Sequence, residues 1–171
     1  MCVNPEALVG DKPIYEVIAH WACGEIVHSN ENAHADQIIE LFDVWPDAAL
    51  GIEDFVIKKF LSHREFLSPV RITSKVEYAL WDDVTQKPIR RLFKQDPSLA
   101  KRTLTDDRQR DFNLWEAGKD HKRDGIKHCY TFLQRCQESA RMRYAAFPLL
   151  FRSNGDLLHA RPPTGKRGHY R

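Results

Sequence analysis

The stretch Ala48-Ala49-Leu50-Gly51-Ile52-Glu53 decides the expected fold, because it is a run of small and branched apolar residues that ends in an acid. Such a run is typical of a strand that is buried on both faces in the middle of a sheet. We expect a central strand from Ala48 to Ile57 that delivers the Glu53 carboxylate to the edge of the sheet, with Asp54 on the opposite face. Glu53 is therefore the first candidate functional residue.

A second acidic signal lies far along the chain, in His121-Lys122-Arg123-Asp124, which opens a long helical segment. His121 and Asp124 are three residues apart, so they lie on the same side of a helix, one turn apart. Together with Glu53 they have the donor atoms of a divalent-metal site. The alternative interpretation is ordinary first-turn chemistry, because acids near a helix start interact favourably with the helix dipole.

The remaining pattern alternates between strands and helices. We expect strands over residues 1–4, 48–57 and 88–95, and a strand pair or one bent strand over residues 15–27. We expect helices over residues 33–42, 69–81, 98–109 and 121–144, with Asn32 and Asp96 as N-caps of the first and third. Early strands followed by alternation with helices indicate an α/β domain with a mixed sheet.

Composition limits the class of protein. The chain has 171 residues, of which 42% are hydrophobic and 29% are charged, which fits one globular domain with a real core. We expect this domain to span residues 1–151, followed by a basic, flexible tail over residues 152–171. No apolar stretch approaches the roughly 20 residues of a membrane span, and the first residues lack a signal-peptide pattern, so we expect a cytoplasmic protein without a membrane partner.

The distribution of charge is more informative than its sum, since 26 basic and 24 acidic residues nearly cancel. Several basic residues follow Glu53 closely in the sequence. They are Lys58, Lys59, Arg64, Arg71 and Lys75. Basic residues grouped beside a carboxylate site suit a partner with a phosphate backbone. The alternative is an ordinary solvated surface.

Several motifs together resemble a known family. Leu50-Gly51-Ile52-Glu53-Asp54-Phe55, followed much later by His121-x-x-Asp124, resembles the RuvC-like branch of the RNase H-fold nucleases, particularly the small Holliday junction resolvases of bacteriophages. The stretches Phe66-Leu67-Ser68-Pro69-Val70-Arg71-Ile72 and Gln95-Asp96-Pro97-Ser98-Leu99-Ala100-Lys101 add to the resemblance. It covers most of residues 1–137.

The resemblance implies an RNase H-like fold with a mixed sheet of about five strands flanked by helices. It implies a homodimer that cleaves branched DNA with two Mg²⁺ or Mn²⁺ ions in each active site. Glu53 would be the central carboxylate and Asp124 the helix carboxylate, and His121 would bind metal or position the attacking water. Lys101 corresponds to a lysine near the scissile phosphate, although a plain exposed lysine is an equally good interpretation.

Asn4 departs from the family pattern, in which the first strand ends in Asp. An amide brings one oxygen and no negative charge to a metal, so two-metal catalysis should suffer. Three explanations remain open: a deliberately inactivated protein, a natural protein that kept binding and lost cleavage, or a wrong alignment of this short strand. In the last case Glu6 or Asp11 supplies the carboxylate.

Two other functions also remain open from the sequence. One is a protein that binds DNA junctions without cleaving them, and the other is a small α/β protein-interaction domain with no nucleic-acid role. Salt-dependent binding to branched DNA distinguishes the first from the second, because contacts to phosphates release counterions.

Overall fold

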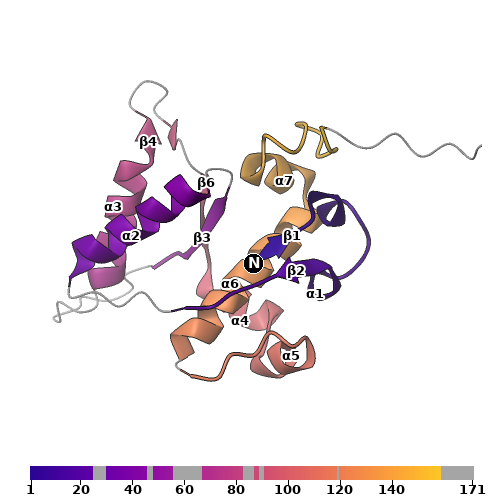
Figure 1. The fold of residues 1–171 in the computed structure, drawn as a ribbon, viewed down its shortest axis with the longest axis horizontal. Helices are drawn as coiled ribbons and strands as arrows, with labels where there is room; N and C mark the ends of the chain where they lie inside the picture. Colours follow the sequence, from indigo (N-terminus) through magenta and orange to yellow (C-terminus); the bar gives the residue numbers. More distant parts are fainter. Residues whose placement is uncertain are drawn as a thin grey trace, which may run out of the picture.

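The computed structural model describes residues 1–24, 30–45, 48–55, 67–82, 87–88, 91–118 and 120–158 (Figure 1). The strands are β1 (Cys2–Val3), β2 (Ile18–His20), β3 (Ala49–Glu53), β4 (Trp81–Asp82), β5 (Lys87–Pro88) and β6 (Arg91–Gln95). The helices are η1 (Pro5–Leu8, a 3₁₀ helix), α1 (Ile14–Val17), α2 (Glu31–Val44), α3 (Ser68–Ala79), α4 (Pro97–Thr103), α5 (Asp106–Asp111), α6 (Asp120–Glu138) and α7 (Ala140–Ala146).

The expected mixture of helices and strands is confirmed, but the described residues are mostly helical and their strands form three two-stranded sheets. β3 and β6 pair in parallel over five residues, whereas β1–β2 and β4–β5 are short antiparallel pairs. A single sheet of about five strands is not seen in this part of the chain. One reason is local: Pro5 starts η1 directly after β1, and residues 14–17 form a helical turn where a strand was expected.

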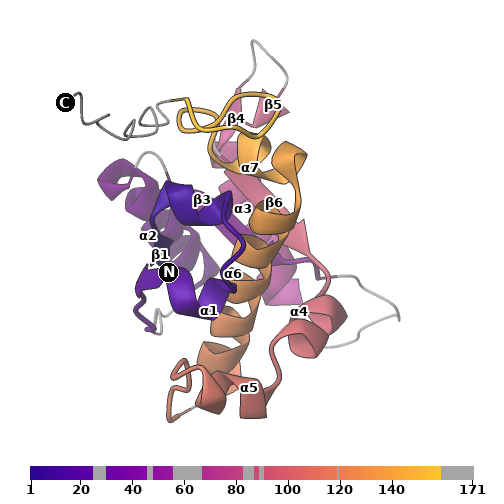
Figure 2. The same ribbon diagram turned by 90° about the vertical axis from the view of Figure 1, so that its right-hand side faces the viewer.

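The parallel pair lies between two layers of helix. α2 and α3 cover one face, where Leu50 and Leu92 pack against Phe42 and Val76. α6 covers the other face, where Phe93 and Phe132 have ring centroids 4.9 Å apart. Figure 1 shows α2 and α3 on one side of β3 and β6 and α6 on the other, and Figure 2 shows α6 running the length of the molecule. The helices on both faces leave Ala49 to Ile52 half-buried, which fits the apolar sequence of β3 before Glu53.

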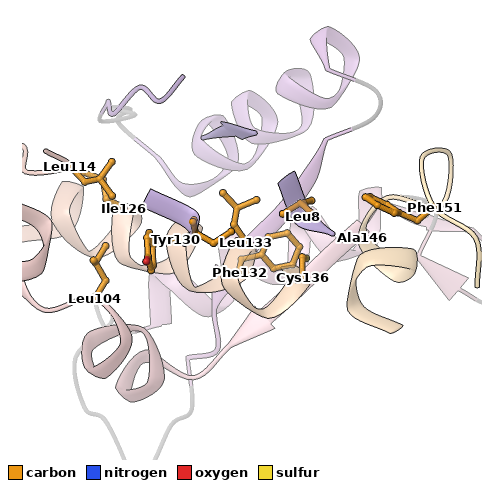
Figure 3. Close-up of a cluster of buried hydrophobic side chains, with 11 residues drawn as sticks. Leu8, Leu104, Leu114, Ile126, Tyr130, Phe132, Leu133, Cys136, Ala146 and Phe151 are labelled. Carbon is orange, nitrogen blue, oxygen red and sulfur yellow. The ribbon is translucent and has the colours of Figure 1, made fainter. Parts of the chain in front are cut away.

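The expected helix over residues 121–144 is two helices in the structure, because α6 ends at Glu138 and Ser139 caps α7. The predicted apolar face is largely confirmed. Ile126, Tyr130, Leu133 and Cys136 are buried together in the main core (Figure 3). Cys129 was expected on this face and is exposed instead.

The segment after β6 begins as predicted. Asp96 is the N-cap of α4, and its carboxylate accepts hydrogen bonds from the backbone N–H groups of Ser98 and Leu99. The helix ends at Thr103, and Thr105 caps a separate α5. At the first long helix, Asn30 rather than Asn32 is the cap, because its side chain accepts a hydrogen bond from the Ala33 N–H.

The first part of the predicted tail is folded. The backbone N–H of Arg152 donates to the Asp156 carbonyl at 2.8 Å, and Phe151 forms an isolated bridge with Leu157. Phe151 is fully buried, so residues 151–157 fold back onto the core, while residues 159–171 lie outside the described residues. None of the helices in the described part of the chain has the length and apolar composition needed to cross a bilayer.

Candidate functional site

Glu53 is the last residue of β3, and hydrogen bonds fix the position of this strand end. The Asp54 N–H donates to the Gln95 carbonyl at 2.8 Å, which continues the parallel ladder one step past Glu53. The buried Gln95 side chain then reaches the helix behind it, because its Nε2 donates to the His128 carbonyl at 3.1 Å. The end of the parallel pair is therefore tied to the middle of α6.

Gly51 permits this close approach of strand and helix. A Cβ atom at position 51 would lie 2.6 Å from Gln95 Nε2 and 3.8 Å from the Phe132 Cβ. The first distance is shorter than any ordinary contact, so a larger residue would displace the Gln95 side chain. This explains the glycine two residues before the acid, since a strand glycine often marks a close approach of neighbouring atoms.

Five charged or titratable side chains lie around the end of β3, and we call them the Glu53 cluster. They are Glu53, Lys101, Asp124, Lys127 and His128. Glu53 Oε2 lies 3.9 Å from His128 Nε2, which is too long for a hydrogen bond. Asp124 lies one turn before His128 on the same face of α6, so two carboxylates from different elements approach one imidazole.

Two lysines hold the Asp124 carboxylate. Lys101 Nζ lies 3.3 Å from Oδ2 and Lys127 Nζ lies 3.0 Å from Oδ1. Lys127 also pairs with Asp106 of α5 at 2.7 Å, so it links α5 to α6. The two lysines differ in exposure, since the side chain of Lys101 is 58% exposed and that of Lys127 is 10% exposed. Lys101 is therefore the lysine that is free to contact an external ligand.

These ion pairs shift the pKa values of the paired groups. Burial alone would raise the pKa of Asp124, but the hydrogen bonds and charges of Lys127 and Lys101 outweigh burial and lower it. Burial alone would lower the pKa of Lys127, but Asp106 and Asp124 outweigh burial and raise it. Both members of the pair are therefore charged over the whole neutral pH range.

His128 differs from its neighbours. Burial lowers the pKa of His128 below its ordinary value, although the negative charges of Glu53 and Asp124 oppose this shift. The imidazole is therefore neutral at neutral pH, and its Nδ1 is buried without a hydrogen-bond partner in the described part of the molecule. A neutral imidazole carries its one proton on either Nδ1 or Nε2, and a proton on Nε2 would face the Glu53 carboxylate.

The structure brings some of the predicted site residues together and separates others. Glu53, Asp124 and Lys101 all belong to the cluster. His121 lines a different cavity, of about 210 Å³, together with Trp21 and Cys23.

Asn4 lies with the short 3₁₀ helix. Its Oδ1 caps η1 by accepting a hydrogen bond from the Glu6 N–H at 3.2 Å. η1 packs on the far half of α6, where Gln137 Nε2 donates to the Ala7 carbonyl at 3.2 Å. Gln137 is more than three helical turns beyond Asp124, which is roughly 20 Å along the helix axis.

The predicted basic residues lie in two places. Arg71 and Lys75 of α3 pair with Glu31 and Asp36 of α2, at 3.4 and 2.6 Å, and so join the two helices. Lys58, Lys59 and Arg64 lie outside the described residues. Of the predicted bases that the structure describes, Lys101 is the one in the Glu53 cluster.

Three residues of the site were not predicted from the sequence. His128 was interpreted as an ordinary helix histidine, Asp106 as part of a solvated helix face, and Gln95 received no role. A signal for His128 was present, because it follows Asp124 by four residues and so shares its helix face. Asp106 and Gln95 come from elements whose packing against α6 cannot be read from local periodicity.

The donor atoms of the Glu53 cluster decide whether it suits a metal ion. Among the described residues, no three Cys, His, Asp or Glu side chains lie close enough to hold a metal ion together. Mg²⁺ keeps several waters and commonly uses one or two carboxylates together with substrate phosphates. Glu53 and Asp124 are the two carboxylates of the cluster, whereas Asn4 lies with η1 beside the far half of α6 and adds no oxygen to them.

Comparisons with family models, curated proteins and solved structures found no match. The interpretation of the Glu53 cluster therefore rests on its own geometry and on the local sequence resemblance. Chemically, the cluster combines the carboxylates of Glu53 and Asp124, the neutral imidazole of His128, and the exposed Lys101, which can bind an anionic oxygen.

Proposed function

We propose that this protein is a metal-dependent endonuclease that cleaves branched DNA, such as Holliday junctions. The observation that carries the proposal is the approach of Glu53, at the end of a parallel strand, and Asp124, on α6, to the same imidazole. These two acids were singled out by the sequence from positions far apart in the chain. An RNase H-like fold for residues 1–151 is part of the proposal, supported by the parallel β3–β6 pair with α6 packed across it.

The chemistry of the proposed reaction is phosphodiester hydrolysis. Bound Mg²⁺ or Mn²⁺ would polarise the phosphate and lower the pKa of water. Glu53 and Asp124 would hold the ion. Lys101 is exposed enough to leave Asp124 and bind a phosphate oxygen, while Lys127 remains buried and keeps the carboxylate oriented. His128 would hold its Nε2 beside the Glu53 carboxylate.

The remaining predicted residues have roles outside this pair of acids. His121 lines the separate cavity beside Trp21 and Cys23, and Asn4 caps η1, so neither is given a role beside Glu53 and Asp124. Lys58, Lys59, Arg64, Arg71 and Lys75 are proposed to contact the DNA backbone. A homodimer would match the two symmetry-related strands of a four-way junction, and DNA affinity should fall steeply with salt.

The second candidate is a protein that binds junctions without cleaving them. Two observations favour it: Asn4 carries no charge and caps η1, and both oxygens of Asp124 already pair with lysines. In such a protein the positive charges of Lys101 and Lys127 would take the place of a metal ion beside Asp124. The exposed Lys101 would still contact phosphate, so binding would be retained.

One assay separates these functions. Wild-type protein and the Asn4→Asp, Glu53→Gln and Glu40→Gln variants are incubated with junction, flap and linear duplex DNA and Mn²⁺. Glu40→Gln is the matched control, because Glu40 is an exposed acid of α2 away from the cluster. We expect junction cleavage by the wild type, lost in Glu53→Gln and retained in Glu40→Gln; if only Asn4→Asp cleaves, the same two changes are made in the Asn4→Asp protein.

The other outcomes are equally clear. Junction binding that falls with salt, without cleavage by either the wild type or Asn4→Asp, would support the binding protein. No binding to any DNA at low salt by folded protein would remove both candidates. A protein-interaction domain would then be the remaining function.

A further inference from the structure

A cavity of about 430 Å³ lies between the N-terminal strand pair and the parallel pair. Cys2 and Val3 of β1 line one side, and Ala49 and Gly51 of β3 line the opposite side. Figure 2 shows β1 and β3 on the same side of α6, with β6 beyond β3. We call this cavity the strand slot, because its two opposite walls are strand edges.

The backbone of β3 presents unpaired groups to the slot. The Asp54 N–H donates to β6, so alternate residues, Leu50 and Ile52, also direct their backbone groups toward β6. Ala49 and Gly51 must then direct their N–H and C=O groups the other way, toward the slot. Within the described residues β3 pairs with β6 alone, and β1 pairs with β2 alone. In the part of the chain that the structure describes, both walls therefore have an edge without a strand partner, and such an edge favours pairing with another strand.

The other two walls of the slot are apolar and come from helices. Cys129, Phe132 and Leu133 of α6 cover one face, and Val44 and Trp45 at the end of α2 reach it from another side. Val44 and Trp45 are large apolar side chains that are 64% and 59% exposed. A strand placed in the slot would be covered by helix residues as well as paired at its edges, as central strands of α/β domains are.

We propose that the strand slot binds an extended apolar peptide segment as an added β-strand. Pairing on both sides would join the two pairs into one sheet of order β2-β1-added strand-β3-β6. The segment is expected to be a continuous run of small and branched apolar residues, because the slot is apolar, and to lack proline, because both edges need N–H donors. Its main-chain hydrogen bonds would supply affinity and the apolar walls would select side chains. This inference does not depend on the nuclease proposal.

The test uses a synthetic peptide with a core of alternating valine and alanine, flanked by lysines for solubility, and the full-length protein. Binding is followed by the tryptophan fluorescence of the protein, to which Trp45 contributes as one of four tryptophans, and by hydrogen exchange of the Ala49 and Gly51 amides. We expect saturable binding and at least about tenfold slower exchange at these two amides. A control peptide of the same sequence carries N-methyl groups on its core amides, which removes its hydrogen-bond donors and keeps its apolar area.

Two matched variants locate the binding site. Val44→Asp places a charge in the wall of the slot, and Leu149→Asp places one at a residue that is equally exposed, 61%, and not in the wall. We expect at least about tenfold weaker binding for Val44→Asp and unchanged binding for Leu149→Asp. Equal binding of the N-methylated peptide, or binding without protection of Ala49 and Gly51, overturns the proposal. Protection that rises with protein concentration in the absence of peptide would show that a second copy fills the slot, and would also overturn it.

Discussion

Glu53 is the last residue of β3 and Asn4 directly follows β1, yet the two strand pairs position these polar residues in different ways. β3 and β6 keep a regular parallel register over five residues, and the pair is covered by helices on both faces. β1 and β2 share only two pairs with a register irregularity between them. Glu53 therefore extends from an anchored strand, whereas Asn4 turns into the cap of a four-residue 3₁₀ helix.

This difference indicates which of the two side chains, Glu53 or Asn4, is held firmly enough to take part in a reaction. Functional side chains need a rigid supporting shell, and Glu53 has one in Gly51, Gln95 and His128. Asn4 has a local hydrogen bond to the Glu6 N–H instead. We therefore expect substitutions around Glu53 to have larger effects than substitutions at Asn4.

Asp124→Asn should have the largest effect. If the protein is a nuclease, we expect junction cleavage to fall by about 100-fold or more, equivalent to roughly 2.7 kcal/mol of activation free energy. Glu6→Gln and Asp11→Asn, which change exposed acids near the β1–β2 pair, should leave the rate within about twofold. Cleavage rates on one junction, with thermal unfolding as a folding check, make the measurement. A comparable loss in Glu6→Gln or Asp11→Asn would mean that the N-terminal pair supplies a carboxylate.

Gly51→Ala tests the anchoring of β3. The added Cβ would meet Gln95 Nε2 at 2.6 Å, and the Gln95 side chain is buried and bonded to α6. We expect a loss of about 1–3 kcal/mol in the free energy of unfolding, as for other overpacked cores. Gly125→Ala is the control, since nothing lies within 4 Å of its added Cβ and it sits within α6. That variant should be more stable than the wild type by about 0.5–1 kcal/mol, as measured by urea unfolding.

Several elements around Glu53 were predictable from the sequence. The apolar run ending in Glu53 identified a strand, although β3 is half-buried and pairs with β6 alone among the described residues, and the Asp96-Pro97 pair identified the start of α4, because both signals are local. The helix that carries Asp124 was also predicted, although its break at Ser139 was not. An element can be predicted from the sequence where its own residues and one capping residue determine where it begins.

The rest depends on contacts between distant segments. The position of Gln95 over Gly51 and the link from Lys127 to Asp106 join elements whose separation in sequence has no periodic signal. The expected strands over residues 15–27 include a stretch that folds as α1, since four residues carry too little pattern to distinguish a helical turn from a strand. The placement of Asn4 was decided by its capping hydrogen bond rather than by strand propensity.

Lys127→Met tests the ion pairs that orient Asp124. We expect a loss of about 1–2 kcal/mol in the free energy of unfolding at neutral pH, because a largely buried cation is removed from two carboxylates and Asp124 keeps Lys101. Since Lys127 lowers the pKa values of Asp106 and Asp124, their stabilisation is present above the unfolded-state pKa and is lost as pH falls through the folded-state pKa.

The pH dependence therefore separates the variant from the wild type. Between about pH 5 and pH 2 the wild type should lose more stability than Lys127→Met, so the two curves converge in acid. Urea unfolding across this range in the presence of EDTA is the measurement. Lys101→Met is the matched control: Lys101 is more exposed, so we expect its neutral-pH stability to change by less than about 0.5 kcal/mol. Parallel curves for the wild type and Lys127→Met would contradict the assigned ion pairs.

Asn4 should give the smallest effect, because its side chain makes one exposed capping hydrogen bond. We expect Asn4→Ala to cost about 0.5–1 kcal/mol, while Asn4→Asp should match the wild type, since Asp caps helices as well as Asn. Urea unfolding of both variants checks this. A loss above about 2 kcal/mol in Asn4→Ala would be too large for a cap and would show that Asn4 is anchored as firmly as Glu53. If Asn4→Asp is as stable as the wild type, any cleavage that it gains is due to the added charge and not to a change in folding.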